Sequence, residues 1–467
     1  MIYWILPHQY RWAVLLAANV VFYASFEARF LLLILILTIA SYYCALYLET
    51  DKKAAKPLFV CMIILIVLTL AVFKYAGFAL DSLQKVTAAF SIPFTAPALR
   101  LLQPIGISFF SFQMIGYLAD VYGGKIPACR HLGKYAVFTC FFPNITSGPI
   151  ERGGHFLPQL DKPQVFDYEK TVYGATLLLT GLIKKIVIAD GLSKYVDNVF
   201  NDLHASAGLA VPVAAVLFAL QIYCDFSGYS DMAVGLAKML GFDLILNFRQ
   251  PYFSPSIKGF WSSWHISLST WLKDYIYIPL GGNRRGKLRR NINLFITFLI
   301  SGLWHGANWT YVLWGAVHGL AQVIENTVYE KTAAGRPPMP GKQDGKNKVL
   351  YFVQVCITFA VVTLAWIFFR ANSISDAFYA ITHLLQPGIL SGTLPALGLV
   401  PRSLVKVLVM IAGLWLFDLF SKRCDPILFL RKQKLPLRWA VYLVFAVLVI
   451  VLKLHGGAKA DFIYFQF

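Results

Sequence analysis

Residues 30–48 read FLLLILILTIASYYCALYL, a run of 19 residues without one charged side chain. At about 1.5 Å of rise per residue, a helix of this length crosses the roughly 30 Å hydrocarbon core of a bilayer. Apolar stretches of similar character recur along the chain, at residues 12–26, 57–73, 172–190, 208–224, 291–303, 350–369, 403–420 and 437–454. The sequence therefore predicts an all-α membrane protein that crosses the bilayer many times.

The composition agrees with a membrane setting. Of the 467 residues, 58% are hydrophobic and only 14% are charged, which leaves too little polar surface for a soluble protein of this length. Long apolar runs exclude a transmembrane barrel, whose strands are about ten residues long and alternate in polarity. We predict roughly ten to twelve membrane-crossing or re-entrant helices around a central tunnel.

The basic residues, 42 Lys and Arg against 23 Asp and Glu, are gathered in short loops rather than spread over one surface. One cluster occupies residues 284–290 and a second occupies residues 422–438. Basic loops next to membrane helices follow the positive-inside rule, so both loops are expected to face the cytoplasm. This distribution argues against nucleic-acid binding and leaves open a contact with an anionic substrate such as a nucleotide.

A Pro- and Gly-rich segment divides the chain. Residues 326–349 contain Arg336-Pro337-Pro338, Pro340-Gly341 and Asp344-Gly345, which do not continue a helix. We predict a front part at residues 1–325, a linker at 326–349 and a back part of apolar helices at 350–467. The seven cysteines show no paired spacing, and neither a metal site nor a cleavable signal peptide is expected.

The region of residues 100–320 is rich in helix breakers and polar side chains. Breaks are predicted at Pro104–Ser108, Phe142–Arg152 and Gly281–Arg284. Non-helical backbone at membrane depth is tolerated where it is buried in protein or lines a wet cavity. The same region holds several polar residues that a purely structural bundle rarely contains, namely Gln221, Asp225, Ser227, Asp231 and Asn247. These features favour a functional site with re-entrant segments.

Three histidines stand out in this region. His305 lies in the aromatic run Gly302-Leu303-Trp304-His305-Gly306-Ala307-Asn308-Trp309, and His265 lies 40 residues earlier among tryptophans. An imidazole at membrane depth suggests acid–base chemistry, which makes His305 the first candidate. His265 is either a second member of the site or an interfacial anchor. His318 is more simply explained by a hydrogen bond to a carbonyl group of a neighbouring helix.

Two classes of function fit these residues. An intramembrane acyltransferase would use a histidine to deprotonate a hydroxyl group, and a proton-coupled transporter would use histidines and buried aspartates as a relay. Transporters are commonly built from two similar halves, whereas the polar residues here lie in one continuous region. The distribution therefore favours an enzyme.

The sequence resembles the membrane-bound O-acyltransferase family. The resemblance rests on two blocks, Phe260–Arg284 (FWSSWHISLSTWLKDYIYIPLGGNR) and Ser301–Ala307 (SGLWHGA). Further similarity lies in Pro104–Phe110, Ser147–Arg152 and Tyr223–Asp231, and in the FIYFQF ending. Within the family these blocks are similar to the bacterial branch that O-acetylates alginate and peptidoglycan, and less similar to teichoic acid D-alanyltransferases.

The resemblance implies a function and a set of site residues. The family's invariant histidine is matched by His305, and a more variable polar position is matched by His265, so both are predicted to be catalytic. Acetyl-CoA is expected as the cytoplasmic donor substrate, and no permanently bound cofactor or metal is expected. Substrate-binding roles are predicted for Trp304, Asn308, Trp264, Asp274, Arg284 and Arg285. Structural or tunnel-lining roles are predicted for Glu151, Arg152, Asp225 and His318.

The same resemblance implies a setting for the reaction. The protein is expected in the bacterial inner membrane, in contact with membrane lipid. It would work with a periplasmic or extracellular acetyltransferase partner on a polysaccharide such as alginate or peptidoglycan. Whether His305 acts as a base or is itself acylated stays open at this point. D-alanyl transfer to teichoic acid and proton-coupled transport are the alternatives.

Overall fold

The structure, a computed structural model, describes residues 2–50, 54–97, 101–332, 335, 337–340, 348–387, 391–455 and 462–463. Within these residues the regular secondary structure is helical, with no β-strand. The chain divides into two compact units, described separately below. Unit 1 comprises residues 1–174 and 236–245, and unit 2 comprises residues 175–235 and 246–467. The sequence-based division into residues 1–325, 326–349 and 350–467 does not coincide with these two units, and it stays a prediction.

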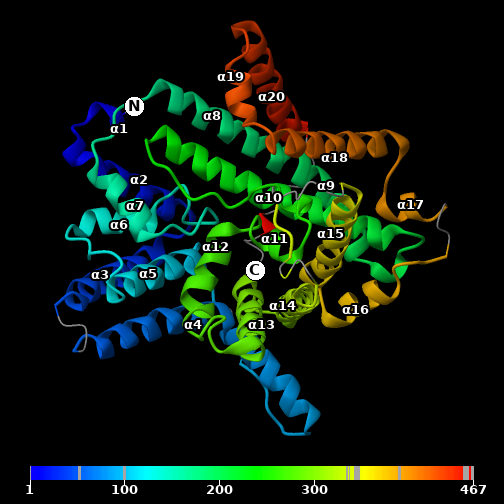
Figure 1. Cartoon of the computed structure of the whole chain (residues 1–467), viewed down its shortest axis with the longest axis horizontal. Helices are drawn as coiled ribbons and strands as arrows, with labels where there is room; N and C mark the ends of the chain where they lie inside the picture. Colours follow the sequence, from blue (N-terminus) through cyan, green and yellow to red (C-terminus); the bar gives the residue numbers. More distant parts are fainter. Residues whose placement is uncertain are drawn as a thin grey trace. The chain divides into compact units, whose positions relative to one another are not determined.

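Unit 1 is a group of helices around α3. Helix α3 packs against α4, α5 and α6, helix α5 packs against α4 and α6, and α2 packs against α6 (Figure 1). Its helices are α1 (Ile2–Ile5), α2 (His8–Glu27), η1 (Ala28–Phe30), α3 (Leu31–Leu48), α4 (Lys56–Ala89), α5 (Ile107–Tyr122), α6 (Leu132–Cys140) and α7 (Gly153–Asp161). The helix α8 (Tyr168–Leu182) begins in this unit and ends in unit 2.

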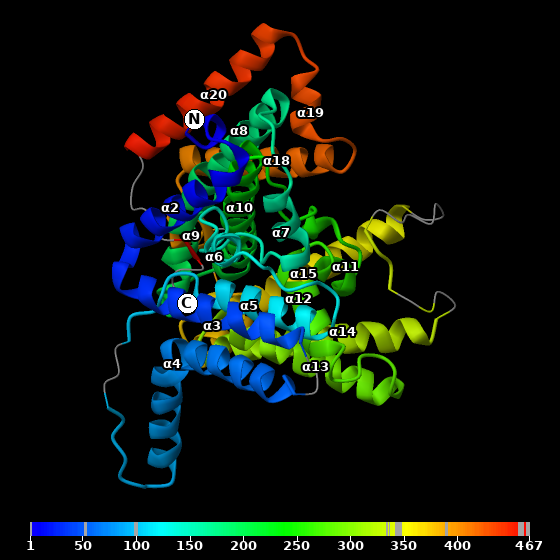
Figure 2. The same cartoon turned by 90° about the vertical axis from the view of Figure 1, so that its left-hand side faces the viewer.

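Unit 2 contains both predicted catalytic histidines. Its helices α13 and α14 lie side by side as a hairpin, visible in both ribbon views (Figures 1 and 2). The helices are η2 (Ile183–Ala189), α9 (Asp190–Phe200), η3 (Leu203–Ala205), α10 (Ala210–Met239), η4 (Pro251–Phe253), α11 (Ile257–Trp261), α12 (Ile266–Leu272), η5 (Lys273–Tyr277), α13 (Gly286–His305), α14 (Trp309–Glu330), α15 (Lys348–Arg370), α16 (Ile374–Thr382), α17 (Thr393–Leu397), α18 (Pro401–Ser421), α19 (Pro426–Arg431) and α20 (Leu435–His455).

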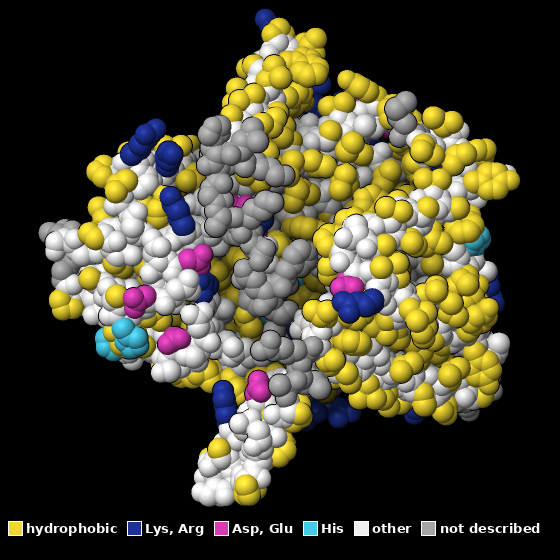
Figure 3. Space-filling view, turned by 180° about the vertical axis from the view of Figure 1, so that it is seen from behind, with side chains coloured by type: hydrophobic (Ala, Val, Ile, Leu, Met, Phe, Trp, Pro, Cys, Tyr) yellow, Lys and Arg dark blue, Asp and Glu magenta, His cyan; other side chains and the backbone are white. Residues whose placement is uncertain are grey.

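Each of the nine apolar stretches of the sequence corresponds to a helix, which confirms the all-α multi-pass fold. Six helical runs in the described chain are long and apolar enough to span a membrane: His8–Leu48, Lys56–Ala89, Tyr168–Phe200, Ala210–Met239, Lys348–Arg370 and Pro401–Ser421. Many large apolar side chains on these runs are exposed, and they cover much of the face in Figure 3. Such a surface suits contact with lipid chains. The total of ten to twelve helices stays a prediction.

The three predicted breaks are present. Helix α5 begins only after Pro104 and Gly106, no regular helix covers residues 141–152, and residues 278–285 form turns. Gly106 has a φ of 73°, and a Cβ there would lie 2.2 Å from the carbonyl oxygen of Ile145. Only glycine fits this position, because it tolerates both the left-handed backbone and the close approach.

Helices extend into both ends of the segment predicted as a linker. Helix α14 continues to Glu330, because residues 326–330 contain no breaker and the first glycine comes at Gly335. Helix α15 starts at Lys348, so it covers the last two residues of the predicted linker. The breaker residues Arg336, Gly341, Asp344 and Gly345 lie outside the described residues, as does the last part of the FIYFQF ending.

Candidate active site

The structure brings His265 and His305 together. His305 is the last residue of α13, and His265 immediately precedes α12. Their ring centroids lie 6.4 Å apart, although 40 residues separate them in the chain. Both side chains are buried, with exposed fractions of 0% and 2%. Two imidazoles thus share one interior site in unit 2, and their catalytic roles stay predictions.

Aromatic rings enclose the two histidines. The ring of Trp304 lies 5.8 Å from His265 and 5.1 Å from His305. The ring of Phe226 on α10 lies 4.6 Å from His265. On the other side, Trp314 of α14 lies 4.9 Å from His305. An apolar surrounding of this kind excludes bulk water and strengthens the electrostatic interactions of a reacting group.

The hairpin of α13 and α14 depends on glycines. A Cβ on Gly302 would lie 2.2 Å from the carbonyl oxygen of Tyr311, and a Cβ on Gly315 would lie 2.3 Å from that of Phe298. Without side chains at these two positions the helix backbones come into direct contact, as small residues allow in membrane proteins. His305 follows Gly302 by three residues, so this contact sets where its backbone lies.

Asn308 begins the second helix of this hairpin. Its side-chain oxygen accepts a hydrogen bond from the backbone N–H of Thr310 at 3.1 Å, which makes it the N-cap of α14. Capping of this kind satisfies a backbone donor that would otherwise be left without a partner. The described interaction of Asn308 is therefore structural, and its predicted contact with substrate stays a prediction.

The backbone of His265 has a strained conformation, and hydrogen bonds from Asn247 hold the residues next to it. Its φ is 43°, a left-handed conformation that is uncommon for residues other than glycine. Asn247 binds the two residues that follow: its carbonyl oxygen accepts from the N–H of Ile266 at 3.0 Å, and its side-chain oxygen accepts from the Oγ of Ser267 at 2.7 Å. The side chain of Asn247 is buried and also donates to Ser230. Asn247 thereby positions His265.

We predict that Asn247→Ala reduces turnover by more than its effect on stability explains. The change removes the side-chain hydrogen bonds that hold the start of α12, which costs about 1–3 kcal/mol when buried partners are left unsatisfied. Turnover and thermal unfolding of the purified protein are the measurements. The control is Asn19→Ala, which removes another buried asparagine, one that accepts from the N–H of Phe142 in unit 1. Equal losses of turnover in both variants would contradict the positioning role.

Side chains of α14 bond both ends of the short helix α11. At the C-terminal end of α11, the indole N–H of Trp261 donates a hydrogen bond to the Nδ1 of His318 at 3.3 Å. At the N-terminal end of α11, the backbone N–H groups of Ile257 and Lys258 donate to the carboxylate of Glu325 at 2.7 and 3.0 Å. His318 therefore bonds an indole, whereas a helix carbonyl was the expected kind of partner. Helix α11 ends four residues before His265, and α14 packs against α13, which carries His305. These contacts therefore connect the segment of His265 with the hairpin of His305.

The other predicted substrate-binding residues differ in placement. The ring of Trp264 stacks on Phe260 at 5.4 Å and lies 5.1 Å from Trp366, inside the aromatic core. Asp274 is half-buried in the π-helix η5. Arg284 and Arg285 are exposed in the turn before α13. Since His305 ends the same 20-residue helix, these arginines lie about 30 Å from it.

Glu151 and Arg152 belong to unit 1. The buried carboxylate of Glu151 accepts a hydrogen bond from the backbone N–H of Ile245 and pairs with the Nδ1 of His155 at 2.9 Å. This hydrogen bond to Glu151 raises the pKa of His155 above the ordinary histidine value, against the opposing effect of burial. Arg152 is the N-cap residue of α7. The contacts of Glu151 link α7 to the segment that follows α10.

Asp225 belongs to a buried charge network that the sequence reading did not identify. Its carboxylate pairs with Lys185 at 2.6 Å and accepts from the N–H of Ile463 at 2.8 Å. Next to it, Lys184 pairs with Asp231 at 2.7 Å. Both lysines lie in the π-helix η2, an irregularity that is frequent at functional sites. The sequence did contain a signal for this network. Two adjacent lysines stand inside an apolar stretch, and buried charges in a membrane require partners of opposite charge.

Sequence comparisons assign the chain to a known family. A family model described as the membrane-bound O-acyltransferase family matches residues 130–378, which contain both histidines. The probable alginate O-acetylase of Pseudomonas putida is 36% identical over 484 aligned residues, covering 100% of this chain and 96% of the relative. That of Pseudomonas aeruginosa is 39% identical, covering 81% of this chain and 70% of the relative.

A relative from another genus points the same way. The peptidoglycan O-acetyltransferase of Helicobacter pylori is 34% identical over 394 residues, covering 78% of this chain and 72% of the relative. The family match spans more than half of the chain, and the similarity to the Pseudomonas putida protein runs over its full length. The chain therefore belongs to the membrane-bound O-acyltransferase family, and it is a multi-pass membrane enzyme that transfers acyl groups to hydroxyl oxygens.

Proposed function

We propose that this enzyme moves acetyl groups from cytoplasmic acetyl-CoA to hydroxyl groups of an extracytoplasmic polysaccharide. The observation that carries the proposal is the buried pair His265 and His305, 6.4 Å apart within an aromatic enclosure. The substrate class follows from the relatives, which are named as alginate and peptidoglycan O-acetylating proteins. The proposed location is the bacterial inner membrane, where a cytoplasmic donor and an outer acceptor are both accessible.

In the proposed reaction His305 acts as a general base. It takes the proton of the acceptor hydroxyl while the oxygen attacks the carbonyl carbon of the thioester. A new C–O bond forms, the C–S bond breaks, and the proton returns to the sulfur of the leaving thiolate. The products are an O-acetyl ester and free CoA. No metal and no permanently bound cofactor take part in this scheme.

The position of His305 suits a base. It is the last residue of a 20-residue helix, and the C-terminal end of a helix carries partial negative charge. That charge stabilises the imidazolium that forms when His305 accepts a proton. His265 faces it as a second imidazole and is proposed to orient the thioester carbonyl or the attacking hydroxyl.

Arg284 and Arg285 are proposed to bind the phosphate groups of the donor. Both are exposed, whereas the neighbouring Arg290 forms an ion pair with Glu330. We predict that replacing Arg284 and Arg285 together with Gln raises the KM for acetyl-CoA severalfold with little change in kcat, because the two charges lie far from the reacting atoms. Steady-state kinetics at two salt concentrations measure this, and Arg290→Gln is the comparison. An unchanged KM would mean that both arginines serve only to orient the protein in the membrane.

The proposal also includes a partner. The acceptor hydroxyl at His305 would then belong to a separate periplasmic or extracellular acetyltransferase, which passes the acetyl group on to alginate, peptidoglycan or another exopolysaccharide outside the membrane. The described part of this chain consists of membrane helices and the short helices between them. Acceptor choice would then depend on the partner.

The experiment that tests the proposal uses the purified protein in sealed vesicles. Acetyl-CoA labelled in the acetyl group is added on one side, and a hydroxyl-bearing oligosaccharide with its periplasmic partner on the other. Released CoA on the donor side together with labelled ester on the acceptor side supports acetyl transfer across the membrane. Transfer from a D-alanyl carrier protein but not from acetyl-CoA would favour D-alanylation. Proton-coupled uptake without any ester formation would indicate transport.

A further inference from the structure

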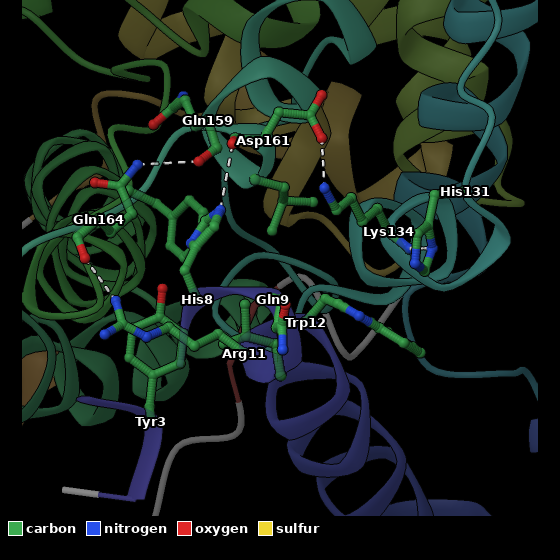
Figure 4. Close-up of a pocket in the computed structure, with 13 residues that line it drawn as sticks. Tyr3, His8, Gln9, Arg11, Trp12, His131, Lys134, Gln159, Asp161 and Gln164 are labelled. Carbon is green, nitrogen blue, oxygen red and sulfur yellow. Dashed lines mark hydrogen bonds and ion pairs between the residues drawn. The ribbon is translucent and has the colours of Figure 1, made fainter. Parts of the chain in front are cut away.

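Unit 1 contains a polar cavity that the proposed reaction does not use. Its volume is about 350 Å³, within the range of small-molecule sites. Figure 4 shows side chains from three segments converging on it: Tyr3 of α1, the first turns of α2, and His131 with Lys134 at the start of α6. The end of α7, with Asp161, closes one wall.

The cavity lies at the end of a membrane-spanning run. His8 and Arg11 occupy the first turn of α2, which begins the run His8–Leu48. The start of α6 contacts this turn, because the ring of His131 lies 4.7 Å from that of Trp12. The ends of spanning helices lie at the depth of the lipid headgroups. The adjoining segment adds Arg130, which pairs with Glu49 after α3.

Positive charge exceeds negative charge in the cavity. Arg11 and Lys134 line it together with one carboxylate, Asp161, which pairs with Lys134 at 2.6 Å. The guanidinium of Arg11 donates to the carbonyl oxygens of Leu6 and Gln164, so its charge is held in place by neutral groups. The cavity therefore carries one uncompensated positive charge beside the Lys134–Asp161 pair.

Two imidazoles supply further donors. The Nδ1 of His131 accepts from the N–H of Lys134, which leaves the proton on Nε2. The Nε2 of His8 donates to the carbonyl oxygen of Asp161 at 3.2 Å. The Nδ1 of His8 is buried and has no hydrogen-bond partner within the described residues. A donor group of a ligand bound in the cavity would provide that partner.

We propose that this cavity binds a phosphate-bearing anion, supplied by the headgroup of an anionic phospholipid. Basic pockets between membrane helices are suited to such headgroups. The helix α1 supports the lipid as the source, because Tyr3 lines the cavity while the neighbouring Ile2 and Ile5 are exposed and can contact acyl chains. The site does not include the histidine pair, and it holds the starts of α2 and α6 and the end of α7 together. It does not rest on the proposed acetyl transfer.

The test measures lipid binding by the full-length protein in detergent. Native mass spectrometry counts bound phosphatidylglycerol or phosphatidylcholine, and thermal unfolding is followed with each lipid and with inorganic phosphate. Lys134→Gln is expected to weaken phosphatidylglycerol binding about fivefold, the effect of one cation near the membrane surface. Lys134→Arg keeps the charge and should bind as the wild type does. The matched control is Lys125→Gln, another lysine of unit 1 paired with an aspartate.

A second variant, His8→Gln, guards against misfolding of the first. Glutamine can still donate to the carbonyl of Asp161 but has no counterpart of the buried Nδ1, so lipid binding should fall while the lipid-free protein unfolds at the wild-type temperature. Phosphatidylglycerol retained equally by Lys134→Gln, His8→Gln and the wild type would overturn the site. Binding of phosphatidylcholine by the wild type as tightly as phosphatidylglycerol would also overturn the site. Stabilisation by inorganic phosphate, lost in both variants, would support the anion site and replace the lipid with a soluble phosphate compound.

Discussion

We expect His305→Ala to lower the rate of acyl transfer by about a hundredfold to ten-thousandfold, the range that follows removal of a general base. The change also leaves a space between Trp304, Trp314 and Phe369, whose rings lie 5.1, 4.9 and 5.5 Å from the imidazole. His305→Gln fills more of that space and is expected to be equally inactive. The measurement is acceptor-dependent release of CoA by protein purified to the same monodispersity as the wild type.

The control for this experiment is His383→Ala. His383 follows α16 in the same unit, where its ring stacks on Tyr379 at 4.0 Å. Wild-type turnover in this control with loss in His305→Ala would link activity to the one imidazole. Wild-type turnover in His305→Ala would remove His305 from the mechanism. A labelled acetyl group that remains on the protein and disappears with His305 would show acylation of the histidine in place of base catalysis.

We expect Gly302→Ala to destabilise the protein and to inactivate it by moving His305. The new methyl group would meet the carbonyl oxygen of Tyr311 at 2.2 Å, which the two helices cannot accommodate without separating. Forced contacts of this kind cost about 1–3 kcal/mol in a packed interior. Thermal unfolding and turnover are measured together. The expected result is a lower unfolding temperature and a large loss of activity.

Gly413→Ala is the matched control for this substitution. Gly413 lies within the membrane-spanning α18, and a Cβ there would have nothing within 4 Å. Alanine favours a helix over glycine by up to about 1 kcal/mol, so this variant should be as stable as the wild type or more stable. If Gly302→Ala behaved like Gly413→Ala, the direct backbone contact of α13 and α14 would not be what positions His305.

Much of the architecture could be predicted from the sequence because a bilayer imposes simple rules. A stretch such as residues 30–48 must form a helix, since its backbone groups find no water to bond. The breaks near Pro104 and Gly281 were equally readable, because proline and glycine act through the local backbone. Helix α14 continues five residues into the predicted linker, because a composition shift marks a helix end less sharply than a breaker does.

The candidate site was only partly readable. His305 stood out because an imidazole in an aromatic run is costly without a function. Asn247, Glu325 and Lys185 were missed or given no role, because each acts on a residue far along the chain: Asn247 holds the start of α12, Glu325 caps α11, and Lys185 pairs with Asp225. Such relations depend on how helices pack and leave no local pattern.

The sequence by itself determined that this protein is a helical membrane enzyme of a known family, and it singled out His265 and His305 as candidates for the site. Hydrophobic length and family motifs are local properties, and they survive without any knowledge of packing. Only the tertiary structure decided that His265 and His305 face each other, that Asn247 holds the left-handed backbone of His265, and that a cationic cavity lies at the start of α2. The physical reason is that contacts between distant segments arise from helix packing, which no single stretch of sequence specifies.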